Sequence, residues 1–415
     1  MKNCLLWFCF VVFGVSLPAD ACTVFYASDG QLMLGGSNED WSDPHTGVFF
    51  IPAEAGKHGW VKFGFMSGWP QGGMNDQGLF WDATACSALD MPDSEANKEK
   101  FDGPLMQKVM EECGTVQEAL CLFEKYYCDD QYKAQYLIGD TTGNSVIVEG
   151  DCYILKDKNY QVMTNFYQSH PDLGGYPCWR YETAVSMLES TDEISTDLFG
   201  AILSATHQEG RYPTQYSNIY DLKSGVVYLC YFHNFEEFIS IDLKANLEKG
   251  RNTHDLPSLF SHIKILGPSS GSRVNPSSVT LRWQGKKTSQ YQLYCSVDPH
   301  FTDCDPMPVT ASHSSHPMVL FATVLMGMAC MGAGSRKRGV AKALIGLTFV
   351  WLILSVQCKG RVTDPSESAG TIQEMHITLE NLEKDVTYYW KVVARPEGNR
   401  DFTSESLVQR FETTN

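Results

Sequence analysis

The feature that most limits how this chain can fold is a pair of alternating apolar runs joined by a short Gly-Asn turn. The first run is residues 136–140, the second is residues 145–149, and Gly143-Asn144 lies between them. Alternation of apolar residues on both sides of such a turn is a strong signal for a β-hairpin. A sheet with an apolar face must pack against another layer, so we expect a layered domain around this hairpin.

The sequence around the hairpin mixes strand and helix patterns. Apolar runs at 153–155 and 226–229 predict further strands, whereas helical periodicity covers 104–127 and 181–188. These runs do not alternate as regular βαβ units, which favours an α+β class for residues 22–250. A chain of 415 residues is long enough for about two domains.

After residue 250 the pattern changes. We expect a linker at 251–262, followed by short β-like runs at the spacing of a sandwich. Residues 263–415 resemble a fibronectin type III module, because Trp283 falls in an early strand and Leu382-x4-Thr387-Tyr388-Tyr389-Trp390 matches that family's corner tyrosine and penultimate strand. The resemblance implies an all-β sandwich.

A long apolar insertion interrupts this module. Residues 318–334 and 340–356 are apolar apart from Lys342, and the basic loop 335–339 joins them. Each run lies near the lower limit of about 17 residues for a spanning helix. The pattern predicts a transmembrane helical hairpin at 318–356 with its basic loop in the cytoplasm. A buried helical hairpin within a larger domain is the alternative.

The first 21 residues are typical of a secretory signal. Lys2 is followed by an apolar stretch from Leu5 to Leu17, and Ala19-Asp20-Ala21 fits an A-x-A cleavage site. We therefore expect an exported protein, tethered by the hairpin, whose residues 22–250 lie on the extracytoplasmic side. The formal net charge of −17 repels nucleic-acid phosphates and excludes nucleic acid as an expected partner.

Cleavage after Ala21 would leave Cys22 with a thiol and a free α-amine on one residue. The thiolate can attack a carbonyl, while the amine, with an ordinary pKa of about 7.7, accepts and returns the proton. None of the 11 histidines falls in a recognisable Cys/His signature. The alternatives are that Cys22 is a disulfide partner or carries a lipid, although the charged Asp20 fits a lipidation site poorly.

An ordered series of motifs beginning at Cys22 resembles the linear-amide C–N hydrolases. These N-terminal-nucleophile enzymes include choloylglycine hydrolases, penicillin V acylases and acid ceramidases. The motifs are, in order, Cys22-Thr23, Asp29-Gly30, Gly36-Ser37-Asn38-Glu39-Asp40-Trp41, Gly73-Met74-Asn75-Asp76-Gln77-Gly78-Leu79, the hairpin strands ending in Gly139-Asp140 and Val148-Glu149, Met163-Thr164-Asn165 and Cys178-Trp179-Arg180-Tyr181. Each motif alone is weak evidence for this family, whereas the ordered set is strong evidence. The resemblance implies an αββα sandwich over residues 22–250.

The resemblance also implies roles for four residues. Cys22 is the nucleophile and its α-amine the base, Asp40 holds and polarises that amine, Asn165 helps to stabilise the oxyanion, and Arg180 binds substrate or supports Asp40. The alternatives are turn or cap roles for Asp40 and Asn165 and a surface position for Arg180. No metal or cofactor is implied, because the nucleophile, base and oxyanion donors are all protein groups.

Two segments depart from the family pattern. Many members have an arginine beside the nucleophile where this chain has Ser37, which removes a positive charge that would depress the thiol pKa. Residues 80–85 replace a strand that contains an asparagine in the bile salt enzymes. We expect Trp41, Asn75 and Trp81 to contact the substrate, with core packing as the alternative for the aromatic rings.

The sequence thus predicts a hydrolase that cleaves a linear, non-peptide amide of an N-acyl compound through a thioester on Cys22. An acyltransferase or an N-terminal-cysteine dipeptidase with the same site is one alternative. A membrane-anchored binding or adhesion protein with a degenerate hydrolase domain is the other; Ser37 supports it, and the joint presence of Cys22, Asp40, Asn165 and Arg180 argues against it.

Overall fold

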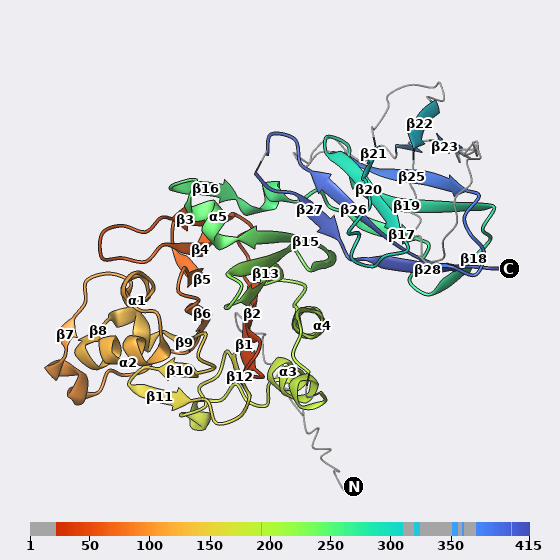
Figure 1. The fold of residues 1–415 in the computed structure, drawn as a ribbon. Helices are drawn as coiled ribbons and strands as arrows, with labels where there is room; N and C mark the ends of the chain where they lie inside the picture. Colours follow the sequence, from red (N-terminus) through yellow and green to blue (C-terminus); the bar gives the residue numbers. More distant parts are fainter. Residues whose placement is uncertain are drawn as a thin grey trace, which may run out of the picture.

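The computed structural model describes residues 22–191, 193–309, 319–323, 351–355, 359–360, 371–399 and 401–415. The predicted signal segment, residues 1–21, lies outside the described residues. Figure 1 shows a larger N-terminal part, coloured red to green, beside a smaller C-terminal sandwich, coloured green to blue.

Two antiparallel sheets form the centre of the N-terminal part. The first sheet contains, in spatial order, β12 (Tyr160–Thr164), β1 (Thr23–Ser28), β2 (Met33–Asp40), β13 (Thr214–Asp221), β14 (Val226–Tyr231) and β15 (Asn234–Asp242). The second sheet contains β11 (Cys152–Leu155), β10 (Ser145–Glu149), β9 (Ala134–Gly139), β6 (Phe80–Ala85), β5 (Pro70–Asn75), β4 (Trp60–Phe65), β3 (Thr46–Ile51) and β16 (Asn252–Asp255). The predicted hairpin is confirmed, because β9 and β10 pair directly around residues 140–144.

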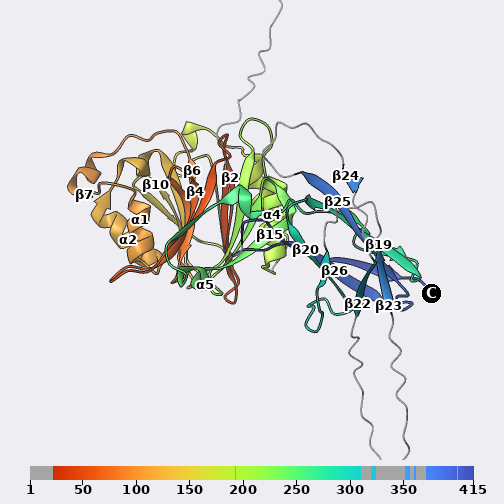
Figure 2. The same ribbon diagram turned by 90° about the horizontal axis from the view of Figure 1, so that it is seen from above.

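Helices cover the outer face of each sheet (Figure 2). The helices α1 (Leu105–Glu112) and α2 (Val116–Lys125) pack on the second sheet, and α3 (Trp179–Glu189) and α4 (Thr196–Thr206) pack on the first. The short α5 (Leu243–Leu247) follows β15 and contacts β3 and β4. Short 3-10 turns at Asp93–Asn97, Asp129–Tyr132 and Pro171–Leu173, and the paired two-residue strands β7 (Glu99–Lys100) and β8 (Tyr126–Tyr127), complete this part.

The helical pattern predicted over 104–127 is divided into two helices by a local signal. The Thr115 hydroxyl accepts a hydrogen bond from the Glu118 backbone at 3.2 Å, and the Glu118 carboxylate accepts one from the Thr115 backbone at 3.0 Å. This reciprocal pair is a capping box, which satisfies backbone donors at the first turn of α2. A new helix therefore begins at Val116.

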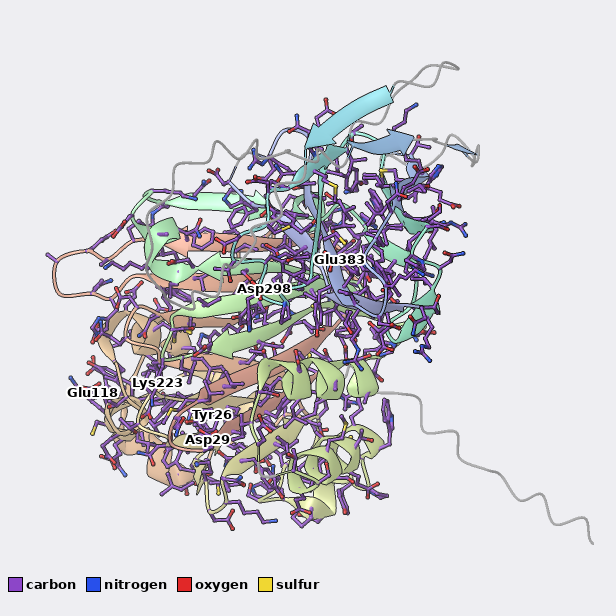
Figure 3. The ribbon with its side chains drawn as sticks, turned by 45° about the vertical axis from the view of Figure 1, so that its right-hand side comes forward. Tyr26, Asp29, Glu118, Lys223, Asp298 and Glu383 are labelled. Atoms are coloured by element: carbon purple, nitrogen blue, oxygen red, sulfur yellow. The ribbon has the colours of Figure 1, made fainter. Side chains whose placement is uncertain are left out.

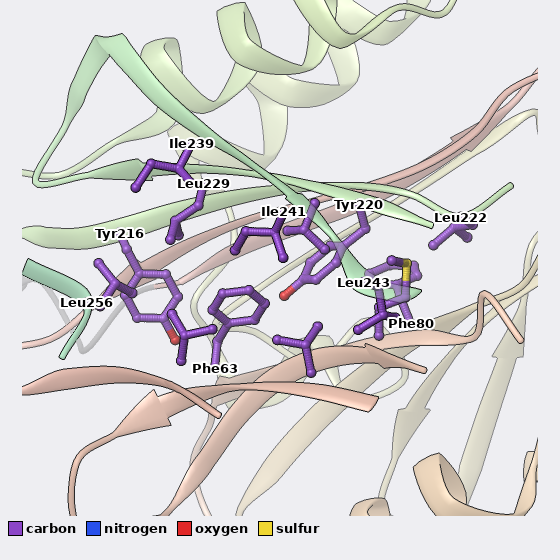
Figure 4. Close-up of a cluster of buried hydrophobic side chains, with 14 of the residues drawn as sticks. Phe63, Phe80, Tyr216, Tyr220, Leu222, Leu229, Ile239, Ile241, Leu243 and Leu256 are labelled. Carbon is purple, nitrogen blue, oxygen red and sulfur yellow. The ribbon is translucent and has the colours of Figure 1, made fainter. Parts of the chain in front are cut away.

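The main core lies between the two sheets of the N-terminal part. Figure 4 shows Phe63 and Phe80 of the second sheet facing Tyr216 and Tyr220 of the first. Because the sheets meet on one face and helices cover the other, the strands near the centre are buried on both faces, as all six residues of β1 are. A strand buried on both sides positions every one of its side chains, including those next to Cys22.

The C-terminal part is a β-sandwich. One layer contains β17 (Lys264–Gly267), β19 (Ser278–Lys286), β25 (Ile372–Glu380) and β24 (Lys359–Gly360). The other contains β21 (Met307–Val309), β20 (Gln290–Ser296), β26 (Thr387–Arg395), β27 (Ser404–Ser406), β28 (Gln409–Thr413) and β18 (Ser272–Val274). This second layer is continuous with the first sheet of the N-terminal part, because β15 pairs with β27. Its core holds Trp283 and Trp390, and the Tyr388 hydroxyl accepts a hydrogen bond from the Glu383 backbone at 3.1 Å. Side chains of both parts are drawn in Figure 3, which labels Tyr26 in the first and Glu383 in the second.

The segment 251–262, expected to be a linker, packs into the main core and pairs with a strand of the second sheet. Strand β16 pairs with β3, and the 3-10 turn Leu256–Leu259 buries Leu256 and Leu259 in the main core. The carboxylate of Glu237 in β15 accepts hydrogen bonds from the backbone of Ser261 at 2.8 Å and Ile263 at 2.9 Å. These contacts fasten the segment to the first sheet just before the sandwich begins.

The predicted fold class is wrong in two respects. The described part of the chain is mostly β, with 43% of its residues in strands and 18% in helices, and not the α+β class that the sequence predicted. The predicted transmembrane helical hairpin is also wrong: within it, β22 (Val319–Thr323) and β23 (Trp351–Ser355) are strands that pair antiparallel. The rest of 318–356 lies outside the described residues.

The membrane partner and the membrane-anchored location depended on that hairpin. In the parts of the chain that the structure describes, no helix combines the length and apolar character needed to cross a bilayer. Apolar composition measures a preference for burial and does not distinguish a helix from a strand, which is why hydropathy alone gave the wrong element.

Candidate active site

Cys22 lies at the start of β1, where its side chain enters the space between the two sheets. Strand β1 pairs with β2 in the register Thr23↔Asn38, which places Cys22 beside Glu39. The Cys22 residue is 8% exposed, and its Sγ lies 3.7 Å from Oε2 of Glu39, close enough for the thiol to donate a hydrogen bond. The hydrogen-bonding partner of the Cys22 thiol is therefore a carboxyl group.

A second carboxyl group joins this pair from the facing sheet. Asp82 of β6 is fully buried, and the backbone N–H of Ala83 donates to its Oδ1 at 2.9 Å. Oε1 of Glu39 is buried without an N–H or O–H donor among the described residues, so a proton shared with Asp82 is what would satisfy it. Burial and then the charge of Asp82 raise the pKa of Glu39, which makes Glu39 the protonated member of the pair.

Burial and the neighbouring acids together favour the protonated form of the thiol. Burial, followed by the charges of Glu39 and Asp40, raises the pKa of Cys22 well above its ordinary value, and a backbone hydrogen bond with Asp40 acts in the opposite direction. As long as Cys22 is joined to Ala21 by a peptide bond, its thiol is thus held in the protonated, unreactive form. Sequence reasoning missed Glu39 and Asp82 as site residues; for Asp82 the available signal was a single acid in the mostly apolar strand β6.

Asp40 lies on the opposite face of β2, toward α3 and α4. Its Oδ1 accepts a hydrogen bond from the Thr214 hydroxyl, and its Oδ2 accepts one from Nε2 of Gln208 at 3.0 Å. Nη1 of Arg180 lies 4.0 Å from the same Oδ2. Burial raises the pKa of Asp40 to about 7, while the Thr214 hydrogen bond, the Arg180 charge and the Gln208 hydrogen bond lower it.

Arg180 connects three of the predicted site residues. It is buried on the first turn of α3, and its Nη1 donates to the backbone carbonyl of Cys22 and, at 3.0 Å, to Oγ1 of Thr23. Its Nη2 donates to Oδ1 of Asn165 at 3.2 Å. Together with Asp40, these contacts bring all four predicted catalytic residues into one cluster around the start of β1.

Asn165 follows β12 and presents an amide to this cluster. Its Oδ1 accepts from Arg180, which fixes the orientation of the amide group and leaves Nδ2 as a donor. Nδ2 donates to the backbone carbonyl of Ala85, at the end of β6, at 2.8 Å. One N–H of that group remains for another acceptor.

The three predicted substrate-binding residues are placed differently. Trp41 is half-buried and lies against Phe65 and Tyr212, with ring centroids 5.9 and 6.3 Å away. The buried Asn75 uses its amide to bond the carbonyls of Met110 and Cys113 and the backbone of the β5–β6 turn. Trp81 is 2% exposed and packs among the residues under α1 and α2, on the face of β6 opposite Asp82. The structure brings none of these three side chains into the hydrogen-bonded cluster at Cys22.

Ser37 occupies the position at which a family resemblance led us to look for arginine. It is fully buried on β2 and pairs with Val24 across the β1–β2 ladder, on the same face as Glu39. The positive charge of the site is therefore supplied from the other face of the first sheet, by Arg180. Taken together, the cluster can position a nucleophile, hold a cation at Asp40 and offer an amide donor to an oxyanion.

Comparisons with known proteins add little to this geometry. No protein-family model matches the chain, and no curated protein matches it significantly. The chain is similar to the structure of penicillin V acylase from Agrobacterium tumefaciens, with 16% identity and a TM-score of 0.41, over 51% of this chain and 82% of that one. It is also similar to astrotactin-2, a conserved vertebrate-specific, perforin-like membrane protein, with 10% identity and a TM-score of 0.19, over 94% of this chain and 65% of that one. Likenesses at these TM-scores do not bear on the chemistry of the site.

Proposed function

We propose that this chain is an N-terminal-nucleophile hydrolase that cleaves a linear, non-peptide amide through a thioester on Cys22. Removal of residues 1–21 would create the free α-amine that the mechanism needs. The observation that carries the proposal is the Arg180 cluster: one guanidinium bonds the Cys22 carbonyl, Thr23 and Asn165 and lies 4.0 Å from Asp40.

Cleavage would switch the thiol from an unreactive to a reactive state. Before cleavage, burial and then the neighbouring acidic groups keep the thiol of Cys22 protonated. Cleavage replaces a neutral peptide group by an amine that can carry a positive charge beside those acids. An ammonium close to the sulfur favours the thiolate and offsets part of the negative field. The same acids retain the ammonium, so the nucleophile and its base form only after processing.

The proposed reaction has two steps. In the first, the Cys22 sulfur attacks the amide carbon, its proton passes to the α-amine, and the amine returns a proton to the leaving nitrogen as the C–N bond breaks. In the second, water attacks the thioester, its proton passes to the α-amine, and the thiol is restored as the C–S bond breaks. The products are a carboxylic acid and an amine, and no oxidant or cofactor is consumed.

Asn165 would stabilise the negative oxygen formed in both steps. Its amide is oriented by Arg180, and a donor already fixed in place needs no reorganisation when charge develops. A single donor of this kind is worth about 3 kcal/mol of transition-state stabilisation elsewhere. Because Arg180 also contacts the Cys22 carbonyl, it would hold the Asn165 amide in a fixed position relative to the nucleophile.

Aromatic rings next to this donor favour an apolar acyl group. Phe166, which follows Asn165, lies with ring centroids 5.2 Å from Tyr181 and 5.4 Å from Tyr176. Tyr176 and Trp179 remain 56% and 52% exposed, so these two large rings leave apolar surface for a ligand to cover. We therefore propose an N-acyl amide whose acyl chain lies against these rings.

The experiment is mass spectrometry of the exported protein after incubation with a thiol-directed acylating probe. We expect a chain that begins at Cys22, carries the probe on that residue, and is not labelled in a Cys22→Ala variant. A Cys121→Ala variant is a matched control, because Cys121 is an exposed cysteine on α2. A chain that begins elsewhere, or a lipid on Cys22, would refute the mechanism.

A further inference from the structure

We propose that His207, Glu209 and His233 form a binding site for one zinc ion, separate from the Cys22 cluster. One ligand atom from each of these residues lies within 4.8 Å of the other two. Nε2 of His207 and Oε1 of Glu209 are 3.7 Å apart. Ligand atoms around a tetrahedral zinc ion lie about 3.3–3.6 Å apart, given Zn–N and Zn–O distances of about 2.0–2.2 Å.

The orientation of His207 leaves its Nε2 free to bind a metal. Nδ1 of His207 lies 2.6 Å from the carbonyl oxygen of Ser204. A carbonyl oxygen can only accept, so Nδ1 carries the hydrogen and the lone pair is on Nε2. Metal-binding histidines in proteins are held in this way, with the second ring nitrogen bonded to a backbone carbonyl or a carboxylate.

His233 is brought to this place by an unusual turn. β14 and β15 pair up to Tyr231↔Asn234, so Phe232 and His233 alone form the loop of the hairpin. Both have a φ of +46°, a conformation that glycine and asparagine adopt readily and that bulky residues adopt rarely. The result is that the His233 ring stacks on the His207 ring with centroids 5.3 Å apart.

The charges around the cluster favour a cation over a simple contact between rings. His207 is the residue that ends α4, so the negative end of the helix dipole points toward the site. Glu209 is the third group, and its exposed side chain can rotate by the small amount that coordination requires.

Two imidazole nitrogens and one carboxylate oxygen are a ligand set that zinc prefers. A three-ligand site leaves a fourth position for water. Residue 208, between two of the ligands, is the glutamine whose Nε2 donates to Asp40 at 3.0 Å. A bound zinc ion would therefore fasten the segment that supports Asp40, without touching the reacting atoms.

The test is zinc titration of the full chain after treatment with a chelator, by calorimetry, together with the absorption spectrum of the cobalt(II)-loaded protein. We expect His233→Ala and Glu209→Gln to weaken binding at least about a hundredfold, since even outer partners of a metal ligand are worth 10–100-fold. The matched control His300→Ala, an exposed histidine of the sandwich, should bind as the original chain does. The cobalt spectrum should lack the near-ultraviolet band of a thiolate ligand.

Three results would overturn the proposal. They are the absence of zinc binding, binding that is unchanged in both ligand variants, and a cobalt spectrum with a thiolate band, which would assign the metal to cysteines. Circular dichroism of each variant separates loss of the metal from loss of the fold. His233→Asn is a second variant at the turn: asparagine tolerates the positive φ but lacks the imidazole, so it should fold and still lose the metal.

Discussion

The spaces between the sheets in the two parts of the molecule are filled very differently. In the C-terminal sandwich, β19 alternates buried and exposed residues, and its buried side chains, Leu281 and Trp283 among them, belong to an apolar cluster. In the N-terminal part, all eight residues of β2 are buried, and Glu39 among them faces Asp82 of the second sheet. A β-sandwich does not need buried acids, and each one costs several kcal/mol to desolvate. The proposed function gives the acids around Cys22 a use that offsets this cost, because they would retain the α-ammonium group.

Two buried glutamates of the first sheet sharpen this contrast. Glu237 accepts hydrogen bonds from two backbone N–H groups, which is a structural use of a carboxylate. Glu39 has one buried oxygen without a donor among the described residues, and its other oxygen faces the Cys22 thiol. Residue type and burial are the same at the two positions, so the difference lies in the partners.

The largest expected effect tests whether the two parts are energetically separate. Trp283→Ala should destabilise the sandwich by about 3–5 kcal/mol, because it leaves a large cavity in an apolar core. The labelling rate of Cys22, measured below the unfolding transition, should not change. Loss of labelling in parallel with unfolding of the sandwich would show that the β15–β27 pairing makes one cooperative unit.

Arg180→Met should lower the reactivity of Cys22 without unfolding the chain. We expect the labelling rate of Cys22 to fall by about a hundredfold, because Asn165 and Asp40 lose the charge that orients them. Arg282→Met is the matched control, since Arg282 pairs with Glu374 on the half-exposed face of the sandwich. That variant should stay within about twofold of the original rate. Equal effects in the two variants would remove Arg180 from the mechanism.

Exchanging each buried glutamate for glutamine should give opposite results. Glu237→Gln should lower the free energy of unfolding by about 1.5–3 kcal/mol, because an amide nitrogen would face a backbone donor. Glu39→Gln should be neutral or stabilising at pH about 8, and its Cys22 should react at a lower pH, because an amide cannot ionise next to the sulfur as the carboxyl group of Glu39 can. Denaturant titration and a pH profile of labelling measure the two quantities. A comparable loss of stability in both variants would contradict a functional use of Glu39.

The smallest expected effect is on the pH dependence of stability. Burial raises the pKa of Asp82 to about 6 and that of Asp40 to about 7, from an ordinary value of 3.8. The folded chain therefore binds more protons than the unfolded chain between pH about 4 and about 7, and stability falls as pH rises through this range. Asp82→Asn should remove part of that slope, on the order of 1–3 kcal/mol in all. Urea titrations at several pH values would detect an unchanged slope, which would contradict the assignment.

Local patterns predicted the elements that depend on neighbours in sequence. The hairpin of β9 and β10, the strands β11 and β14, and helix α3 follow from alternation, a turn or helical periodicity, and the structure has them. The apolar run at 318–356 was misread because hydropathy reports burial without specifying a helix or a strand. The division of the first helical region at Thr115 required a capping box to be recognised.

The site could be predicted only in part, for a physical reason. Cys22 and Asp40 belong to motifs that are contiguous in sequence, whereas Asp82 acts on Cys22 from the facing sheet and His233 lies against His207 because of a two-residue turn. Contacts between side chains of different layers leave no periodic pattern in the sequence. The roles of Asn165 and Arg180 rested on a resemblance, and the geometry is what brings these two residues next to Cys22.

The most direct test of the central claim compares two chains that differ by one residue at the amino terminus. One begins at Cys22 and the other at Ala21, both released from a fusion by a specific protease, and hydrolysis of an N-acyl amide is measured for each. The account predicts turnover by the first chain and none by the second, because only the first has the α-amine that accepts the thiol proton. Equal turnover by both chains would contradict it and would assign the base to a side chain such as Glu39.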